Sequence, residues 1–104
     1  MTLQEFDATL KTAVPEAYEL TAPKSKQRFV VWHRYGYQSM GGDDRNQLLA
    51  PKVQIDIVTN IHDDTLLDDV CAALWSLDLP FTVESEGYDD EYCAFRTILQ
   101  LVVI

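Results

Sequence analysis

The spacing of hydrophobic residues predicts a helix at the start of the chain. Phe6 and Leu10 recur at helical intervals. Thr2 and Glu5 stand in the T-x-x-E spacing of a capping box, in which each side chain accepts a hydrogen bond from the backbone of the other residue. Pro15 then ends the helix, because proline lacks the N–H that a helix interior requires.

A second helix is predicted to be capped by residues 60–64 and to end near Leu77. Its beginning is acidic, which the helix dipole favours at an N-terminus. An apolar stripe at helical spacing predicts the side that packs on the core: Leu66, Leu67, Val70, Leu74 and Leu77. The opposite side of the predicted helix carries Asp64, Asp68, Asp69, Ala72, Trp75 and Ser76.

The remaining segments have the alternation, or the β-branched and aromatic composition, of strands: residues 17–22, 28–35, 51–59, 80–85 and 91–104. Residues 36–50 are interpreted as a long connection and residues 86–90 as a turn. Hairpin-like joins favour antiparallel pairing. The order α-β-β-β-α-β-β therefore predicts a single α+β domain over residues 1–104. We expect a mainly antiparallel sheet of four to five strands, with two helices packed on one face.

The end of the chain is apolar, with the run LVVI at residues 101–104. An apolar strand of this kind must be paired or covered. It can pair within the chain or with a second subunit, and the sequence leaves both alternatives open.

The charge of the chain is unevenly divided. The formal net charge is −9, and residues 1–58 hold seven acidic and seven basic side chains. Residues 59–104 hold ten acidic side chains and one basic side chain, Arg96. An acidic half repels the phosphates of nucleic acids, so specific DNA or RNA binding is disfavoured and a basic partner is favoured.

Composition narrows the class of protein further. Hydrophobic residues make up 47% of the chain, an ordinary value for a globular domain. We expect no membrane segment, because no apolar run approaches the ~18 residues of a span. We also expect no signal peptide, because the N-terminus lacks a basic start and an apolar stretch. Cys71 and Cys93 have no CxxC spacing, which favours a reduced cytosolic protein.

The sequence offers little catalytic chemistry. It has no GxGxxG, Walker A, GxSxG or HExxH motif. His33 lies in a predicted strand among aromatic residues, where a structural role is favoured. Aspartates crowd around His62 and could offer oxygen ligands to Ca²⁺ or Mg²⁺, but the EF-hand spacing is missing and helix N-termini attract aspartates without a metal. We therefore expect no enzymatic activity, no metal and no cofactor.

Trp75 is the most unusual residue on the polar side of the second helix. An exposed aromatic ring with a polar rim is typical of an interface. The ring could equally cover a loop of its own chain, and both alternatives stay open.

Several short motifs occur in one order along the chain: AP at 22–23, FVVW at 29–32, GDDR at 42–45, VQIDIVT at 53–59 and YDDE at 88–91. Together with the leucine-rich helix, this pattern over residues 1–104 resembles the tail-completion proteins of long-tailed bacteriophages. These are tail terminators and head–tail joining proteins, some of which are described as minor capsid proteins. The resemblance implies a ring, commonly of six subunits, that caps the tail tube, stops its growth and gives the head a docking surface.

The resemblance also implies partners and sites. The partners would be further copies of the chain, the tail-tube protein and a head-completion protein, and DNA would only pass through the lumen. The protein would work in the host cytoplasm during assembly and then at the tail–head junction of the virion. The predicted ring or tail-tube contacts are Met40, Asp43, Asp44, Arg45, Asp68, Ala72 and Trp75. The predicted acidic face toward the lumen or a partner comprises Asp64, Asp69, Glu84, Glu86, Asp89 and Asp90.

The strongly acidic second helix is not a mark of this family, so the assignment of faces stays open. The second hypothesis is a small acidic DNA mimic that inhibits a host nuclease or DNA-binding protein. Its carboxylates would be spaced like phosphates, and it would be a monomer or a dimer.

Overall fold

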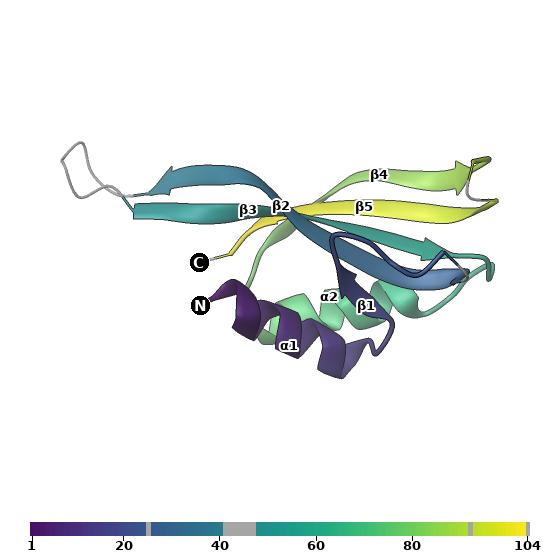
Figure 1. Cartoon of the computed structure of the whole chain (residues 1–104), viewed down its shortest axis with the longest axis horizontal. Coiled ribbons are helices and arrows are strands. Elements are labelled where there is room, and N and C mark those ends of the chain that lie inside the picture. The colour runs from purple at the N-terminus through teal and green to yellow at the C-terminus, as the bar shows by residue number, and fades with distance from the viewer. Residues whose placement is uncertain (25, 41–47, 92, 104) are drawn as a thin grey trace.

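The computed structural model describes residues 1–24, 26–40, 48–91 and 93–103, and of Met40 and Leu48 only the backbone. The elements are α1 (Leu3–Ala13), β1 (Ala17–Glu19), β2 (Arg28–Met40), β3 (Leu48–Thr59), α2 (Leu66–Ser76), β4 (Phe81–Asp89) and β5 (Ala94–Val102). The strands form one sheet of five in the order β1-β2-β3-β5-β4. Both helices lie on the same face of that sheet (Figure 1). The α+β prediction, with its order of elements, is confirmed.

The sheet is antiparallel except at one edge. β3 pairs antiparallel with both β2 and β5, and β5 pairs antiparallel with β4. β1 runs parallel to β2, from Ala17 opposite Val30 to Glu19 opposite Trp32. The first strand is shorter than predicted, because Leu20 has a positive φ of 70° that turns the chain out of the strand.

The long connection predicted for residues 36–50 is wrong in large part. β2 continues to Met40 and β3 begins at Leu48, with Gln38 opposite Ala50. Pro51 lies inside β3, where a proline is tolerated only if its missing N–H is not needed. Its carbonyl accepts a hydrogen bond of 2.9 Å from the Val103 N–H. Because the nitrogen and carbonyl of one residue in an antiparallel strand point to the same side, the Pro51 nitrogen also faces the β5 side, where the pairing of β3 with β5 ends.

The turn predicted for residues 86–90 is also wrong in large part. β4 extends to Asp89, although its pairing with β5 shifts register between Val83 and Ser85. Glu86 and Asp89 of this segment therefore lie along a strand at the edge of the sheet. In the apolar end of the chain, residues 101–103 are paired within the chain, because β5 lies between β3 and β4 and the Val103 N–H donates to the Pro51 carbonyl.

The hydrophobic core fills the space between the helices and the sheet. The Phe6 and Trp32 rings meet edge to face, with centroids 5.3 Å apart, and both side chains are almost fully buried. The Trp32 indole N–H donates to an Asp7 carboxylate oxygen at 2.8 Å, so its polar atom is satisfied. The predicted stripe of α2 supplies buried Leu66, Val70 and Leu74, with Leu67 and Leu77 partly buried beside them. The predicted capping box at Thr2 and Glu5 is present.

The molecule is elongated. Its principal extents are 48, 26 and 22 Å. The excess length comes from the hairpin of β2 and β3, which runs past both helices and past the chain termini (Figure 1). We call residues 35–40 and 48–51 the arm, and the helices with the sheet portion that they cover the body.

Candidate interaction surfaces

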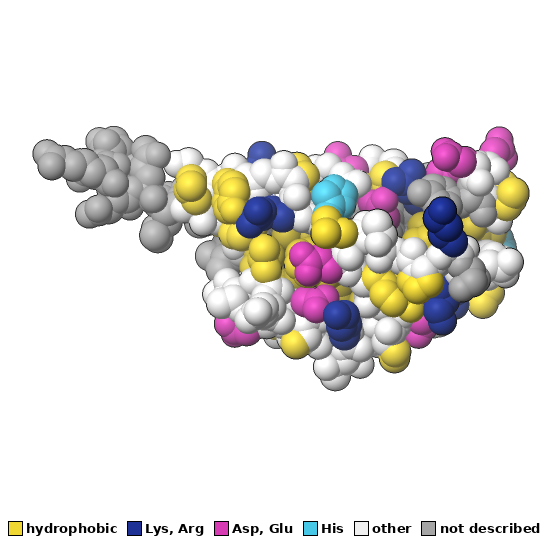
Figure 2. All heavy atoms as spheres, viewed as in Figure 1, with side chains coloured by type: hydrophobic (Ala, Val, Ile, Leu, Met, Phe, Trp, Pro, Cys, Tyr) yellow, Lys and Arg dark blue, Asp and Glu magenta, His cyan; other side chains and the backbone are white. Residues whose placement is uncertain are grey.

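The arm carries exposed apolar side chains. The exposed fractions are 44% for Tyr35, 49% for Tyr37 and 62% for Leu49. Figure 2 shows hydrophobic side chains gathered on the arm. Neither helix reaches this part of the hairpin (Figure 1), so the arm pairs its own backbone but leaves these side chains to solvent.

Two cations accompany the tyrosines of the arm. The Arg34 guanidinium carbon lies 4.9 Å from the centroid of the Tyr37 ring, and the Lys52 ammonium lies 5.9 Å from that of Tyr35. Such contacts hold a cation beside an aromatic ring without removing it from solvent. The arm therefore combines an aromatic surface with positive charge.

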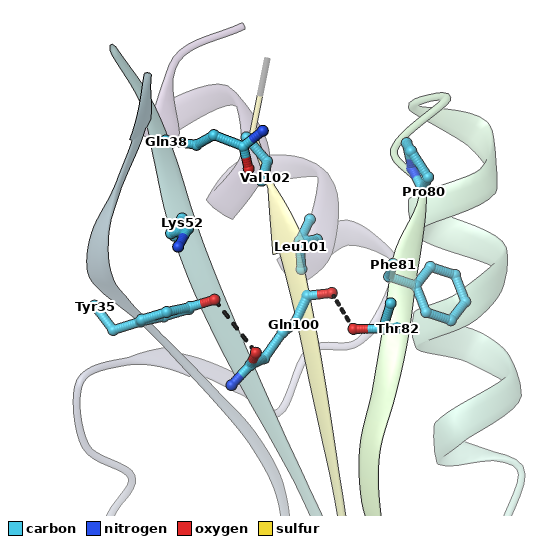
Figure 3. A pocket seen from close by; sticks show the side chains of 9 residues that line it. All are labelled: Tyr35, Gln38, Lys52, Pro80, Phe81, Thr82, Gln100, Leu101 and Val102. Atoms are coloured by element: carbon cyan, nitrogen blue, oxygen red, sulfur yellow. Dashed lines mark hydrogen bonds between the residues drawn. The ribbon is translucent and has the colours of Figure 1, made fainter. Parts of the chain in front are cut away.

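A shallow hollow lies at the base of the arm, lined from β2, β3, β4 and β5 (Figure 3). The Tyr35 hydroxyl lies 3.4 Å from the Gln100 side-chain oxygen, and the Thr82 hydroxyl lies 3.4 Å from the Gln100 carbonyl oxygen. The lining residues are Tyr35, Gln38, Lys52, Pro80, Phe81, Thr82, Gln100, Leu101 and Val102. This lining offers apolar contact and hydrogen bonds to a neighbouring surface.

The edge strand β4 and the adjacent side of α2 form a second exposed surface. Every residue from Thr82 to Tyr88 is exposed, and Val83 has 52% of its surface in solvent. Trp75 is 67% exposed, and its ring lies 6.2 Å from that of Phe81, centroid to centroid. The ring therefore leans on an edge strand and leaves most of its surface open.

The predicted contact residues divide into three groups. Asp68 and Ala72 are exposed on the side of α2 that carries Trp75, so the structure brings these three together. Met40 ends β2, on the arm and far along the chain from that group. Asp43, Asp44 and Arg45 lie outside the described residues.

Asp64 is wrongly placed in the predicted outward acidic face. Its carboxylate is 7% exposed and forms two bonds with Arg28, Nε–Oδ2 at 2.6 Å and Nη2–Oδ1 at 3.0 Å. The Thr59 hydroxyl donates to it at 2.5 Å, and the Leu66 N–H donates at 3.2 Å. Hydrogen bonding from Arg28 is the main reason that the pKa of Asp64 falls from 3.8 to about 2. Asp64 thus fixes the start of α2 to β2 and β3.

The other predicted acids lie along α2 and β4. Asp69, Glu84, Glu86 and Asp90 are exposed. Asp89 is partly buried, with a carboxylate oxygen 3.4 Å from Arg96 Nη1, and Arg96 Nη2 lies 2.7 Å from Asp56 Oδ2. Only part of the negative charge is therefore open to a partner.

Two exposed residues of the arm, Tyr35 and Tyr37, were not predicted as contacts, whereas Leu49 ends the segment from Met40 that was. The signal was present, because Tyr37 continues the alternation of His33 and Tyr35 beyond the predicted strand end at residue 35. It was overridden by Gly36 and Pro51, which are usual at the ends of strands.

Other chemistry in the described residues is sparse. Cys71 is partly buried, which raises the pKa of its thiol, and Cys93 is exposed; both are free thiols. In the described part of the chain, no group of three or more His, Cys, Asp or Glu side chains is placed to hold a metal ion. The described helices include none with the length and apolar character needed to cross a membrane.

A scan of the chain against protein-family models finds no match, and a search of curated proteins finds none. The functional argument therefore rests on the surfaces described above.

Proposed function

We propose that this chain is a structural protein that assembles with copies of itself into a ring, in the manner of a phage tail-completion protein. The observation that carries the proposal is the arm, which projects from the body and exposes Tyr35, Tyr37 and Leu49. Exposed apolar side chains on a projecting element are typical of a surface that another protein covers.

The composition of the arm suits a protein contact. Tyrosine and arginine are enriched among the residues that dominate binding energy at interfaces. Covering each large apolar side chain of the arm would contribute roughly 1–2 kcal/mol, from about 25 cal/mol for each Å² removed from water. Tyr35, Tyr37 and Leu49 together would therefore contribute roughly 3–6 kcal/mol to each contact, before the cost of association is subtracted.

The resemblance extends this proposal to a place in the virion. The ring would cap the tail tube, dock the head-completion protein and let DNA pass through its lumen, after assembly in the host cytoplasm. Exposed acids such as Asp69, Glu84 and Glu86 would repel the phosphates of DNA that moves past them. A six-subunit ring is the expected form.

The DNA-mimic hypothesis is less well supported. Asp56, Asp64 and Asp89 pair with arginines of the same chain, which reduces the charge available to imitate phosphates. That hypothesis also assigns no role to the arm.

The direct test is the mass and shape of the purified full chain. Native mass spectrometry and negative-stain electron microscopy, over a range of concentrations and with tail-tube protein added, should show a closed ring with a central opening. A chain that stays monomeric or dimeric under all these conditions contradicts the proposal. Salt-sensitive binding of that monomer to a basic DNA-binding protein would favour the mimic instead.

A further inference from the structure

We propose that neighbouring copies join edge to edge, with the β2 strand in the arm of one copy pairing with β4 of the next. This inference rests on the proposed ring and specifies its contact and its direction. It follows from two uncovered strand edges on one sheet and from their opposite charges.

The first uncovered edge belongs to β2. β1 pairs with β2 only at Val30, Val31 and Trp32, and no other described strand lies on that side of β2. Tyr37 stands opposite Pro51, whose backbone polar groups face β5. Tyr37 and Pro51 therefore exchange no backbone hydrogen bonds with each other. The N–H and C=O of Tyr37 point away from β3, to the uncovered side of β2.

The second uncovered edge belongs to β4. This strand is last in the sheet and pairs only with β5 among the described strands. An edge strand displays a row of backbone donors and acceptors that can extend a sheet. The residues from Thr82 to Tyr88 are all exposed, which leaves room for a further strand.

The two edges carry opposite charges. The β2 segment from residue 33 to residue 40 includes Arg34 and no acid, and Lys52 lies beside it on β3, whereas residues 81–89 include Glu84 and Glu86 and no base. Opposite charges across a strand pair are favourable, and like charges are unfavourable by a similar amount. A β4–β4 contact between two copies would set acid against acid.

The charges therefore favour a head-to-tail contact over a two-fold one. A head-to-tail contact uses two different surfaces on each copy and generates a ring when its rotation closes. A symmetric dimer through either edge would bring like charges together. The unequal charging of the two edges thus fits the assembly that the proposed function requires.

The apolar side chains of the two surfaces lie on matching faces. Leu49 lies on the same face of β3 as buried Val53 and Ile55, which is the face that the helices cover. Phe81 and Val83 stand opposite the core residues Leu101 and Leu99, so they also lie on that face. A continuous sheet across two copies would place Tyr37, which shares this face with Pro51, next to β4 of the neighbour, with Leu49 one strand further away on β3.

The acids of β4 and its register shift between Val83 and Ser85 also protect an edge against aggregation. The same acids do not oppose β2, which brings Arg34 and has Lys52 on the strand beside it. The acids of β4 can therefore discourage aggregation at this edge and still allow it to pair with β2 of a neighbouring copy.

The test is a reciprocal charge reversal in the full chain. One variant carries Arg34→Glu with Lys52→Glu, and the other carries Glu84→Lys with Glu86→Lys. Each alone should raise the apparent dissociation constant of self-assembly by about tenfold or more, because its two edges then have the same sign. A 1:1 mixture should assemble as well as the wild type, and so should the variant with all four changes. A control with Lys11→Glu, on α1, should assemble normally.

Sedimentation and native mass spectrometry separate the outcomes. If both reversals assemble as the wild type does, or if the mixture fails to recover, the edge pairing is overturned while the ring proposal stands. If the mixture recovers but forms open chains, the pairing is supported and the ring is overturned. A wild-type chain that never self-associates overturns both.

Discussion

The body and the arm of this molecule differ in how far their large side chains are buried and hydrogen-bonded. In the body, the indole of Trp32 is bonded to Asp7, and the carboxylate of Asp64 is bonded to Arg28. In the arm, Tyr37 and Leu49 are built into a regular hairpin and left about half or more exposed. The difference indicates that the body carries the stability of the fold, and it supports the proposal that the arm contacts a neighbour.

The largest predicted effect is a change in the body. Trp32→Ala should lower the free energy of unfolding by about 3–5 kcal/mol, because it empties a buried site against Phe6 and leaves Asp7 without its indole donor. Urea unfolding measured by circular dichroism would show this as a lower midpoint. A loss below about 1 kcal/mol would contradict the assignment of the core.

The second effect is pH-dependent. The pKa of Asp64 is lowered to about 2, so the folded state holds this carboxylate ionised more strongly than the unfolded state does. Its stabilisation is therefore present above about pH 4 and is lost as the pH falls through about 2. We expect about 1–2 kcal/mol for this loss, allowing for solvent screening at Arg28.

Asp64→Asn gives the matched control for that pH dependence. The variant should lose about 2 kcal/mol of stability at neutral pH, because it removes the carboxylate that Arg28 and Thr59 share. Its unfolding free energy should then fall less between pH 4 and pH 2 than that of the wild type. An identical pH profile for the two proteins would show that Asp64 is not the group responsible.

The third effect separates assembly from stability. Tyr37→Ser with Leu49→Ser should change the free energy of unfolding by no more than about 0.5 kcal/mol per site, because both side chains are exposed. It should still weaken self-assembly, measured by sedimentation, because the contact loses its apolar surface. The control is Leu20→Ser, which removes a similarly exposed leucine (67%, against 62% for Leu49) outside the arm. Equal weakening by both would contradict a specific role for the arm.

The smallest effect is expected at Trp75. Trp75→Ala should cost less than about 1 kcal/mol of stability, since 67% of the residue is in solvent and its ring contact is with Phe81 alone among the described aromatics. Assembly should weaken less than in the arm variant, because Trp75 lies beside the proposed strand pair and not within it. Circular dichroism and sedimentation of the same sample would measure both quantities.

The sequence predicted the body better than the surfaces. The helices followed from local signals, such as the capping box at Thr2 and the apolar stripe through Val70, because these act within a few residues. The ends of the strands could not be predicted from local signals. A proline inside β3 is acceptable only because its nitrogen faces the end of the pairing with β5, and that pairing depends on Val103, far away in the sequence.

The charged residues show the same limit. Asp64 is the same residue type as the adjacent, exposed Asp63, and the approach of Arg28 from another strand makes it internal. Sequence periodicity placed Trp75 on an exposed side correctly, since that placement needs only the helix itself.

Amide hydrogen exchange at two protein concentrations tests the division between body and arm most directly. On assembly, peptides that cover residues 33–40 and 81–89 should become more protected, while those that cover α1 should exchange at an unchanged rate. Unchanged exchange in both edge segments, under conditions where sedimentation shows that the chain has assembled, would contradict the account.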